Sequence, residues 1–360
     1  MKSILLAVIF TLSANFILAQ DNNPLFVVMV NDKVGYIDQS GKITIEPQFE
    51  GGNDFSEGLA IASVYNKRGK YKSGYIDKTG RFVVQPVFDT AWDFSEGLAR
   101  VSFGKCGSPN NDNEKIGFID KSGKFVIKPK CGKFYSFSDG LALAFDNGKY
   151  GFIDKIGKVV IPIKFESATN FSEGYSSVFV EGKYGFIDKT GKIVIEPQFA
   201  CSGGFSEGLA DVKIGGEVCD PHAADGTSGI EEATHGYIDK SGKIVLKLDK
   251  EFIQTNPFSE DVGVIANGSD HYLIDKSGNL TLIPKYGGQN EFSEGLMRII
   301  VPGGKFVFIN KKGEIVLRVD FDSASNFRNG LAQVAEGDYP PSAKYGYIDK
   351  TGKVIWNPTK

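Results

Sequence analysis

The stretch KYGFIDKTGKIVIEPQF, residues 183–199, decides the fold of this chain because it is one copy of a repeat. Taken alone it looks like a site, since Asp188, Lys189, Thr190 and Gly191 could hold a metal or a phosphate. The same pattern, however, occurs at eight other places in the chain. An enzyme needs one active site rather than nine, so the pattern predicts a structural unit.

Each copy contains a turn of the form Asp-Lys-Ser/Thr-Gly between two apolar runs. Aspartate in the first position accepts a hydrogen bond from the backbone N–H two residues on, and glycine adopts positive φ without steric cost. We therefore expect a hairpin with a type I turn closed by a glycine bulge. A proline such as Pro47 or Pro197 should end the second strand. The nine turn glycines are Gly41, Gly80, Gly123, Gly157, Gly191, Gly242, Gly278, Gly313 and Gly352.

A second motif, Phe-Ser-Glu-Gly-Leu-Ala, recurs from Phe55 to Phe327 and leads into a third apolar run. The runs do not alternate with polar residues, which predicts small sheets covered on both faces. The chain is thus predicted to be all-β, with nine tandem three-stranded antiparallel meanders stacked as propeller-like blades or as an open superhelical array. Closed propellers typically have four to eight four-stranded blades, so the sequence leaves closure open, as it does a short fourth strand from the connector.

The spacing of the two motifs separates a constant side of the array from a variable one. From a turn glycine to the glycine of the next Phe-Ser-Glu-Gly there are 17 residues in seven of eight cases, whereas the return distance varies from 17 to 34. Because the strands run up, down and up, the variable loops share one rim, the top rim. The Asp-Lys-Thr-Gly and Phe-Ser-Glu-Gly turns share the bottom rim. The longest insertions are residues 104–115 and 215–235, and insertions confined to one face often mark a binding face.

These repeats resemble the WG-repeat family of bacterial proteins, also called KWG repeats. The resemblance rests on the Gly-Tyr/Phe-Ile-Asp-Lys-x-Gly-Lys turn, the Pro-x-Phe after it and the Phe-Ser-Glu-Gly-Leu-Ala, and it spans nearly all of residues 20–360. It implies a β-rich repeat domain and no particular activity. The eponymous tryptophan before glycine is replaced here by Val34, Ser73, Ile116, Tyr150, Tyr184, His235 and Tyr345.

The N-terminus has the layout of a secretory signal: Lys2, then an apolar run from Ile4 to Ala19. A membrane span needs about 20 apolar residues, and this run is shorter. We expect a signal peptide over 1–19 and a single nine-unit repeat domain over 20–360, exported to the periplasm or the exterior. The net charge of −3 gives no basic surface for nucleic acid, and no second apolar run suggests a membrane span in the mature chain.

Export places the four cysteines in a compartment that permits disulfides. Cys106 and Cys219 lie in the two long insertions. Cys131 and Cys201 each follow a third strand, which ends at the same rim. We therefore predict the bridges Cys106–Cys131 and Cys201–Cys219, the alternative being four free thiols.

The candidate site residues all lie in the second insertion. Asp220, His222 and Asp225 could ligate a metal, although with only three histidines in the chain no metal or other cofactor is expected. Glu231 and Glu232 are adjacent acids. The favoured hypothesis is a non-catalytic binding or scaffold protein whose partner is a protein or glycan of the cell envelope. The alternative is an envelope enzyme that acts on glycans with acids of 215–235, which needs two carboxylates roughly 5–10 Å apart.

Overall fold

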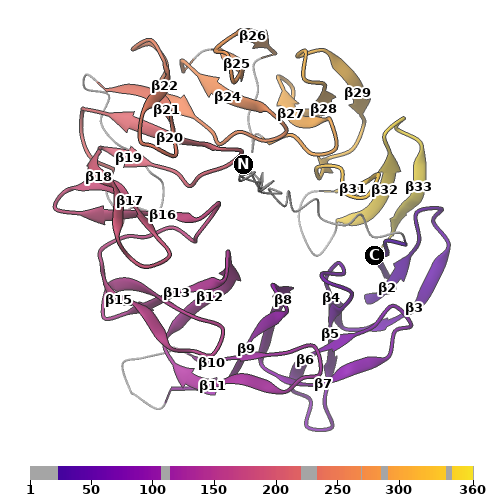
Figure 1. The fold of residues 1–360 in the computed structure, drawn as a ribbon. Coiled ribbons are helices and arrows are strands. Elements are labelled where there is room, and N and C mark those ends of the chain that lie inside the picture. The colour runs from indigo at the N-terminus through magenta and orange to yellow at the C-terminus, as the bar shows by residue number, and fades with distance from the viewer. Residues whose placement is uncertain are drawn as a thin grey trace, which may run out of the picture.

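The computed structural model describes residues 23–359 except 107–113, 220–232, 269, 285–290 and 338–342. These residues form nine small antiparallel sheets, without a helix, arranged in a ring (Figure 1). The sheets are the blades of a nine-bladed β-propeller, which confirms the predicted all-β class and the propeller-like stacking. The ring is closed, because β1 of the first blade contacts β32 and β33 of the last.

The first five blades follow one another in chain order. Blade one contains β1 (Phe26–Val30), β2 (Lys33–Ile37) and β3 (Ile43–Phe49); blade two β4 (Gly51–Gly52), β5 (Ala60–Tyr65), β6 (Tyr71–Ile76) and β7 (Phe82–Phe88); blade three β8 (Thr90–Ser95), β9 (Leu98–Lys105), β10 (Glu114–Ile119) and β11 (Phe125–Cys131); blade four β12 (Lys133–Ser138), β13 (Leu141–Asp146), β14 (Lys149–Ile153) and β15 (Val159–Phe165); and blade five β16 (Tyr175–Val180), β17 (Lys183–Asp188) and β18 (Ile193–Phe199).

The last four blades complete the ring. Blade six contains β19 (Cys201–Ser202), β20 (Leu209–Ile214), β21 (Thr234–Asp239) and β22 (Ile244–Lys247); blade seven β23 (Gln254–Thr255), β24 (Val262–Ala266), β25 (His271–Asp275) and β26 (Leu280–Ile283); blade eight β27 (Met297–Val301), β28 (Lys305–Ile309) and β29 (Ile315–Val319); and blade nine β30 (Ser323–Ala324), β31 (Leu331–Glu336), β32 (Lys344–Asp349) and β33 (Val354–Thr359).

Six blades have a fourth strand, so the prediction of three strands per unit is wrong for them. The connector from one blade's outermost strand supplies this innermost strand of the next, as β4 does when Gly51 pairs with Ser63. Four of these strands are only two residues long, so they have no periodicity that a sequence could display. The constant length of the connectors follows, because each one passes from the outside of one blade to the inside of the next.

The Asp-Lys-Thr-Gly segment is the predicted turn. Gly191 N–H donates to the Asp188 carbonyl at 2.9 Å, and the Asp188 carboxylate accepts from Thr190 N–H at 2.8 Å. Gly191 has φ +83°. The stretch 183–199 is therefore architecture, and its aspartate is occupied in holding its own turn.

The prolines, by contrast, do not end their strands as predicted. Pro197 lies inside β18, at a register shift opposite Gly185. A Cβ on Gly185 would lie 2.6 Å from the Ile195 carbonyl oxygen and 2.7 Å from the Pro197 nitrogen, so the backbones touch and only glycine fits. Proline is tolerated because β18 is an edge strand. In blades seven and eight, Tyr272 and Val307 stand in place of this glycine, and no register shift occurs at either position.

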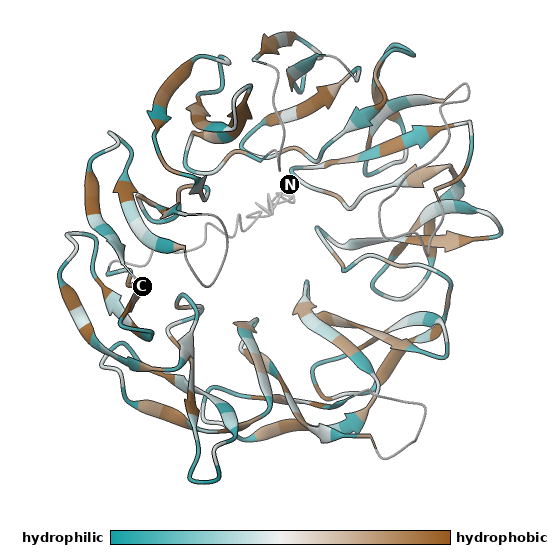
Figure 2. Ribbon diagram, turned by 180° about the vertical axis from the view of Figure 1, so that it is seen from behind, coloured by the Kyte–Doolittle hydropathy of each residue, from teal (hydrophilic) through white to brown (hydrophobic). Residues whose placement is uncertain are grey.

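The core lies between blades and is built on repeated aromatic pairs. The aromatic residue of the second strand packs against the phenylalanine of the next blade's Phe-Ser-Glu-Gly, as Phe186 does against Phe205 with ring centroids 5.0 Å apart. The outermost strands alternate instead: in β18 Ile195 is buried while Val194 is exposed. Figure 2 shows hydrophobic segments in strands all around the ring. The prediction that both faces of each sheet are covered is therefore wrong for the outermost strands, because they form the outer circumference of the ring.

Candidate functional site

The Phe-Ser-Glu-Gly segments of the bottom rim are two-residue hairpin turns. Glu173 and Gly174 both have positive φ, +53° and +93°, as a type I′ turn requires. Ser172 and Tyr175 exchange backbone hydrogen bonds on either side of it. The hairpin joins the innermost segment of a blade to its next strand and presents the glutamate toward the following blade.

Each of these hairpins is bonded to the next blade through its polar residues. Ser172 Oγ donates to the Phe205 carbonyl at 2.7 Å, and the Glu173 carboxylate accepts from Gly208 N–H at 3.0 Å. The same carboxylate forms an ion pair with Lys240 at 3.0 Å. Seven lysine–acid latches join neighbouring blades in this way: Lys121–Glu57, Lys155–Glu96, Lys189–Asp139, Lys240–Glu173, Lys276–Glu207, Lys311–Glu260 and Lys350–Glu294.

The latches assign the bottom-rim charges a structural role. Their side chains are partly exposed, so each ion pair contributes about 0–1 kcal/mol. Lys189, which looked like part of a site, pairs with Asp139 of the preceding blade. Sequence reasoning found these charges but not their partners, which lie 50 to 69 residues away in the chain.

The top rim carries both disulfides. The structure pairs Cys106 with Cys131 (Cα–Cα 5.8 Å) and Cys201 with Cys219 (Cα–Cα 5.4 Å), the two pairings expected from the sequence. Each bridge ties the base of a long insertion to its own blade. Cys219 N–H also donates to the Ala200 carbonyl at 3.0 Å.

The insertion residues singled out by sequence lie outside the described part of the chain. This holds for Asp220, His222 and Asp225 as well as for Glu231 and Glu232, so the expectation of no metal there, and the alternative of a pair of acids, stay predictions. Within the described residues, no group of three metal-ligating side chains occurs. Nor does any helix there have the length and apolarity to cross a bilayer.

A cavity of about 280 Å³ lies between blades three and four, beside the first insertion. Its walls include Trp92, Glu114 and Tyr135. The Arg100 guanidinium lies 3.8 Å over the Trp92 ring and donates to the Phe134 carbonyl. Burial lowers the pKa of Arg100, and no carboxylate among the described residues forms an ion pair with it. Blade eight has a similar arrangement, in which Arg298 lies 5.4 Å over the Phe306 ring and donates to the Ala324 carbonyl.

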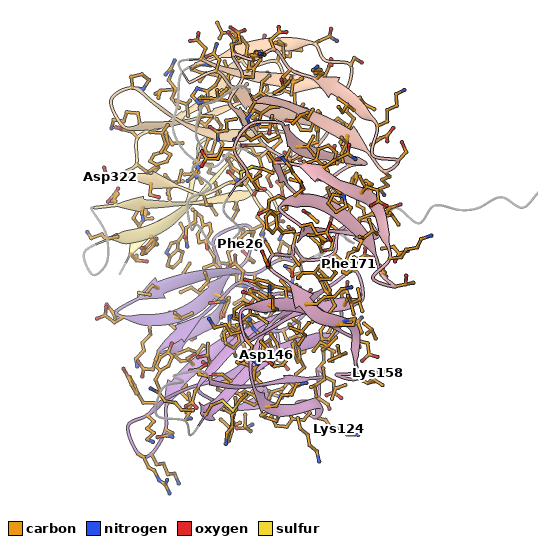
Figure 3. All side chains as sticks on the ribbon, turned by 90° about the vertical axis from the view of Figure 1, so that its left-hand side faces the viewer. Phe26, Lys124, Asp146, Lys158, Phe171 and Asp322 are labelled. Atoms are coloured by element: carbon orange, nitrogen blue, oxygen red, sulfur yellow. A yellow bond between two sulfur atoms is a disulfide. The ribbon has the colours of Figure 1, made fainter. Side chains whose placement is uncertain are left out.

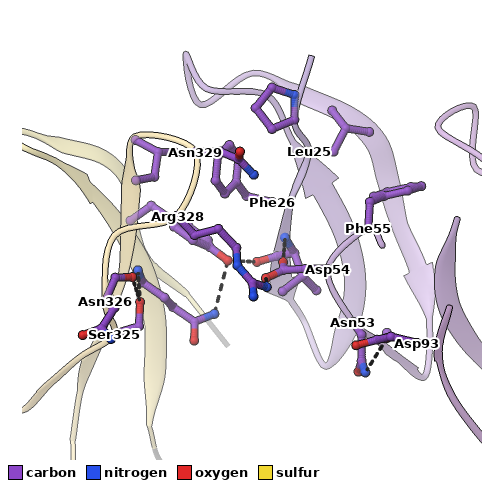
Figure 4. Close-up of a pocket in the computed structure, with 16 residues that line it drawn as sticks. Leu25, Phe26, Asn53, Asp54, Phe55, Asp93, Ser325, Asn326, Arg328 and Asn329 are labelled. Atoms are coloured by element: carbon purple, nitrogen blue, oxygen red, sulfur yellow. Dashed lines mark hydrogen bonds and ion pairs between the residues drawn. The ribbon is translucent and has the colours of Figure 1, made fainter. Parts of the chain in front are cut away.

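A second cavity, of about 360 Å³, lies at the seam where blade nine meets blade one (Figure 4). The chain has nine turn glycines but only eight Phe-Ser-Glu-Gly motifs, and the missing copy belongs to blade one. That unequal count is the signal by which the sequence could have revealed the cavity. Asp54 and Arg328 face each other across it at 3.9 Å. Enclosure raises the pKa of the Asp54 carboxyl, opposed by its hydrogen bond from Val27 N–H and by Arg328.

At the latch position of this seam, neutral groups take the place of the lysine–acid pair. Gln39 Nε2 donates to the Asn329 carbonyl at 2.7 Å, where other blades have lysine and an acid. Phe26 packs against Tyr347 with ring centroids 5.5 Å apart and so replaces the usual aromatic pair. No strand is exchanged between the first and last blades among the described residues, so side chains hold the ring closed there.

Comparison with known proteins agrees with this repeat architecture. The family described as WG containing repeat matches residues 35–67, 74–105, 116–150, 150–184, 184–217 and 308–339, more than half of the chain. No curated protein shows significant sequence similarity to it.

Among solved structures, the computationally designed protein Ika8 is 12% identical, with 92% of this chain and 98% of that one covered and a TM-score of 0.44. BamB from Moraxella catarrhalis is 9% identical (86% and 93% covered, TM-score 0.44). Apo AztD from Citrobacter koseri is 12% identical (92% and 93% covered, TM-score 0.40). Similarities at this level carry no argument about function.

Proposed function

This chain belongs to the WG-repeat family, and from that premise we propose that it is a non-catalytic binding or scaffold protein that holds its partner at the top rim. The partner class is a protein or glycan of the cell envelope. Contact centres on the insertions 104–115 and 215–235. The bottom rim serves to hold the ring together.

The contrast between the two rims carries this proposal. On the bottom rim, the repeated lysines and acids are paired with each other in the seven latches. Connectors of one length leave little room for variation there. On the top rim, insertions cost little because loop-closure entropy grows slowly with length. Both long insertions are anchored at their bases by disulfides, and ordering a loop in advance lowers the entropic cost of binding.

The cavity beside Trp92 and Arg100 strengthens the case for the first insertion. Aromatic and arginine side chains dominate the binding energy of protein interfaces. This cavity places both next to the bridge Cys106–Cys131, and Glu114 at the end of the insertion contributes to its wall. The proposed contact surface therefore includes described residues as well as the insertion itself.

Export and the lack of catalysis belong to the same proposal. Two disulfides are typical of oxidising compartments such as the periplasm or the exterior, and the apolar N-terminal run is typical of a secretory signal. The repeated polar motifs, such as Asp188 in its turn and Glu173 in its latch, have structural partners that explain them. The chain therefore needs no catalytic role to account for its repeated polar residues.

Loop trimming tests the proposal. Each insertion is shortened to the length of the blade-five loop SSVFVEGKYG, which removes Cys106 or Cys219, and the matching Cys131 or Cys201 is changed to serine. A capture experiment from envelope extract identifies the partner of the intact mature protein, and titration then gives its Kd for each variant. We expect at least one trimmed variant to lose tenfold or more in affinity.

A bottom-rim variant supplies the control. Lys189→Gln removes one latch charge far from the insertions, and its affinity for the partner should stay unchanged. If both trimmed variants fold and keep the affinity of the intact protein, the top rim is the wrong surface, and a loss of affinity in Lys189→Gln would move the contact to the bottom rim.

A further inference from the structure

Blade one lacks an innermost strand, and the seam cavity occupies the place of that strand. In blade two, the innermost segment donates from Asn53 N–H to the Ile61 carbonyl at 3.2 Å. Val27 holds the position of Ile61 in blade one, because Val27 opposes Tyr36 as Ile61 opposes Tyr75. No backbone segment among the described residues pairs with this edge of β1.

Side chains of neighbouring blades bond to the edge instead. The Tyr347 hydroxyl donates to the Val27 carbonyl at 2.8 Å, and Thr359 Oγ1 donates to the Met29 carbonyl at 2.6 Å. Val27 N–H donates to the Asp54 carboxylate at 3.5 Å, a long and therefore weak bond. Elsewhere in the ring the equivalent tyrosine donates to the innermost segment of the next blade, as the Tyr36 hydroxyl does to the Asn53 carbonyl at 2.9 Å. An added strand can therefore accept the hydrogen bond that Tyr347 now donates to Val27.

The walls of the cavity suit a peptide with a positive charge. Asn53 and Asp54 come from blade two, Asp93 from blade three, and Asn326 and Arg328 from blade nine (Figure 4). Two carboxylates thus face one guanidinium. Asn326 Oδ1 is shielded from solvent and has no hydrogen-bond partner, so it is available to an amide N–H that enters the cavity.

We propose that this seam slot binds an extended peptide carrying a lysine or arginine, which adds the missing innermost strand to blade one. Its backbone pairs with Val27 and Met29, and its cation lies between Asp54 and Asp93. Addition of a strand to a free sheet edge is an established mode of peptide recognition. The chain's own residues 17–22, which precede the described part of blade one, contain no lysine or arginine to place between the two carboxylates, and Asp21 adds a like charge. This site is separate from the top rim and stands independently of the proposed function.

The chain supplies its own probe, because GKFYSFSDG, residues 132–140, contains the innermost strand of blade four. Ser136 in it aligns with Asp54 and Asp93 of the neighbouring motifs. Two fluorescent peptides are made with Lys133→Ser in both, one with Ser136→Lys and one with Ser136→Asp, so that only the first carries a cationic side chain. Fluorescence anisotropy with the mature protein should show the lysine peptide binding at least tenfold more tightly than the aspartate peptide.

Protein variants then locate the site. Asp54→Asn should reduce the preference for the lysine peptide to less than threefold, whereas Asp146→Asn, on β13 of blade four (Figure 3), should leave it unchanged. Ser325→Trp, which fills the slot, should abolish binding while the thermal unfolding midpoint stays within a few degrees. If that variant fails to fold, amide hydrogen exchange replaces it, with protection of residues 26–30 expected on addition of the lysine peptide.

Three results would overturn the proposal. They are equal affinity for the two peptides, no binding of the lysine peptide up to millimolar concentration, and binding that leaves exchange at residues 26–30 unchanged. Binding that survives in Ser325→Trp but disappears when the 104–115 insertion is trimmed would move the peptide to the top rim.

Discussion

The carboxyl of Asp211, on β20 of blade six, provides a quantitative test of how the blades pack. Its Oδ1 is shielded from solvent and has no hydrogen-bond partner. Burial raises the pKa of this carboxyl from 3.8 to about 6, opposed by its own backbone N–H and by Thr255 of the next blade. The side chain therefore lies in a blade interface that favours its neutral form.

The sign of the effect on stability follows from this shift. Because the pKa is higher in the folded state than in the unfolded chain, ionisation of Asp211 destabilises the fold as the pH rises through about 6. The replacement Asp211→Asn stays neutral at every pH. Linkage between the two pKa values gives the variant a relative gain of less than about 1 kcal/mol at pH 4 and about 3 kcal/mol at pH 7.5. The difference between the two pH values, on the order of 2 kcal/mol, is free of any constant cost of the substitution.

Urea unfolding of the two proteins at pH 4 and pH 7.5 measures this difference. Asp188→Asn is the matched control with the opposite sign, because the hydrogen bond from Thr190 lowers the pKa of Asp188 in its turn. The ionised form of Asp188 stabilises the fold. The unfolding free energy of Asp188→Asn relative to the unchanged protein should therefore be lower at pH 7.5 than at pH 4. A relative stability of Asp211→Asn that is the same at both pH values, or lower at pH 7.5, would refute the account of this interface.

Three further predictions concern the repeat, the disulfides and catalysis. Gly185→Ala should cost about 3 kcal/mol of unfolding free energy because its Cβ would meet backbone atoms, whereas Gly204→Ala, with open space around it, should be within about 0.5 kcal/mol of neutral in the same urea titration; equal effects would contradict the close approach. Mass spectrometry of a non-reduced digest should recover Cys106–Cys131 and Cys201–Cys219, each bridge contributing on the order of 3 kcal/mol by closing a loop, and four alkylatable thiols would show the pairing to be wrong. The purified mature protein should hydrolyse no member of a glycan, ester and peptide panel; turnover that disappears on substitution of acids in 215–235 would favour the enzyme alternative.

The repeat could be predicted from the sequence because its two turn motifs recur at a visible period. The fourth strand could not, since two residues such as Gly51 and Gly52 form a strand only when a neighbour pairs with them. The prediction that Pro197 ends its strand is wrong. Proline lacks an N–H and so interrupts most strands, but β18 is an edge strand and needs no hydrogen bond from this residue, which lies beside Gly185. Closure of the ring could not be predicted either, because the contact between Phe26 and Tyr347 forms only when the first and last blades meet.

The candidate site was predictable to a smaller degree. The assignment of loops to two rims could be predicted from strand direction and loop length, and so could the cysteine pairing. The latches could not be predicted, because nothing in a single sequence indicates that an exposed lysine in one unit pairs with an acid in another. The seam cavity exists because blade one lacks a Phe-Ser-Glu-Gly motif. The sequence indicates this, since it has nine turn glycines but only eight copies of that motif.

Cross-linking across the seam tests the closed nine-bladed ring most directly. Gln39 and Asn329, which are 290 residues apart in the chain, share a hydrogen bond of 2.7 Å in the closed ring. In the variant Gln39→Cys with Asn329→Cys, a short bismaleimide should give an intramolecular link in nearly every molecule at low protein concentration, seen as a linked peptide pair after digestion. The pair Gln39→Cys with Lys189→Cys, which joins blades one and five, should give none. Links that form only between molecules, or an equal yield for both pairs, would contradict closure and favour an open array.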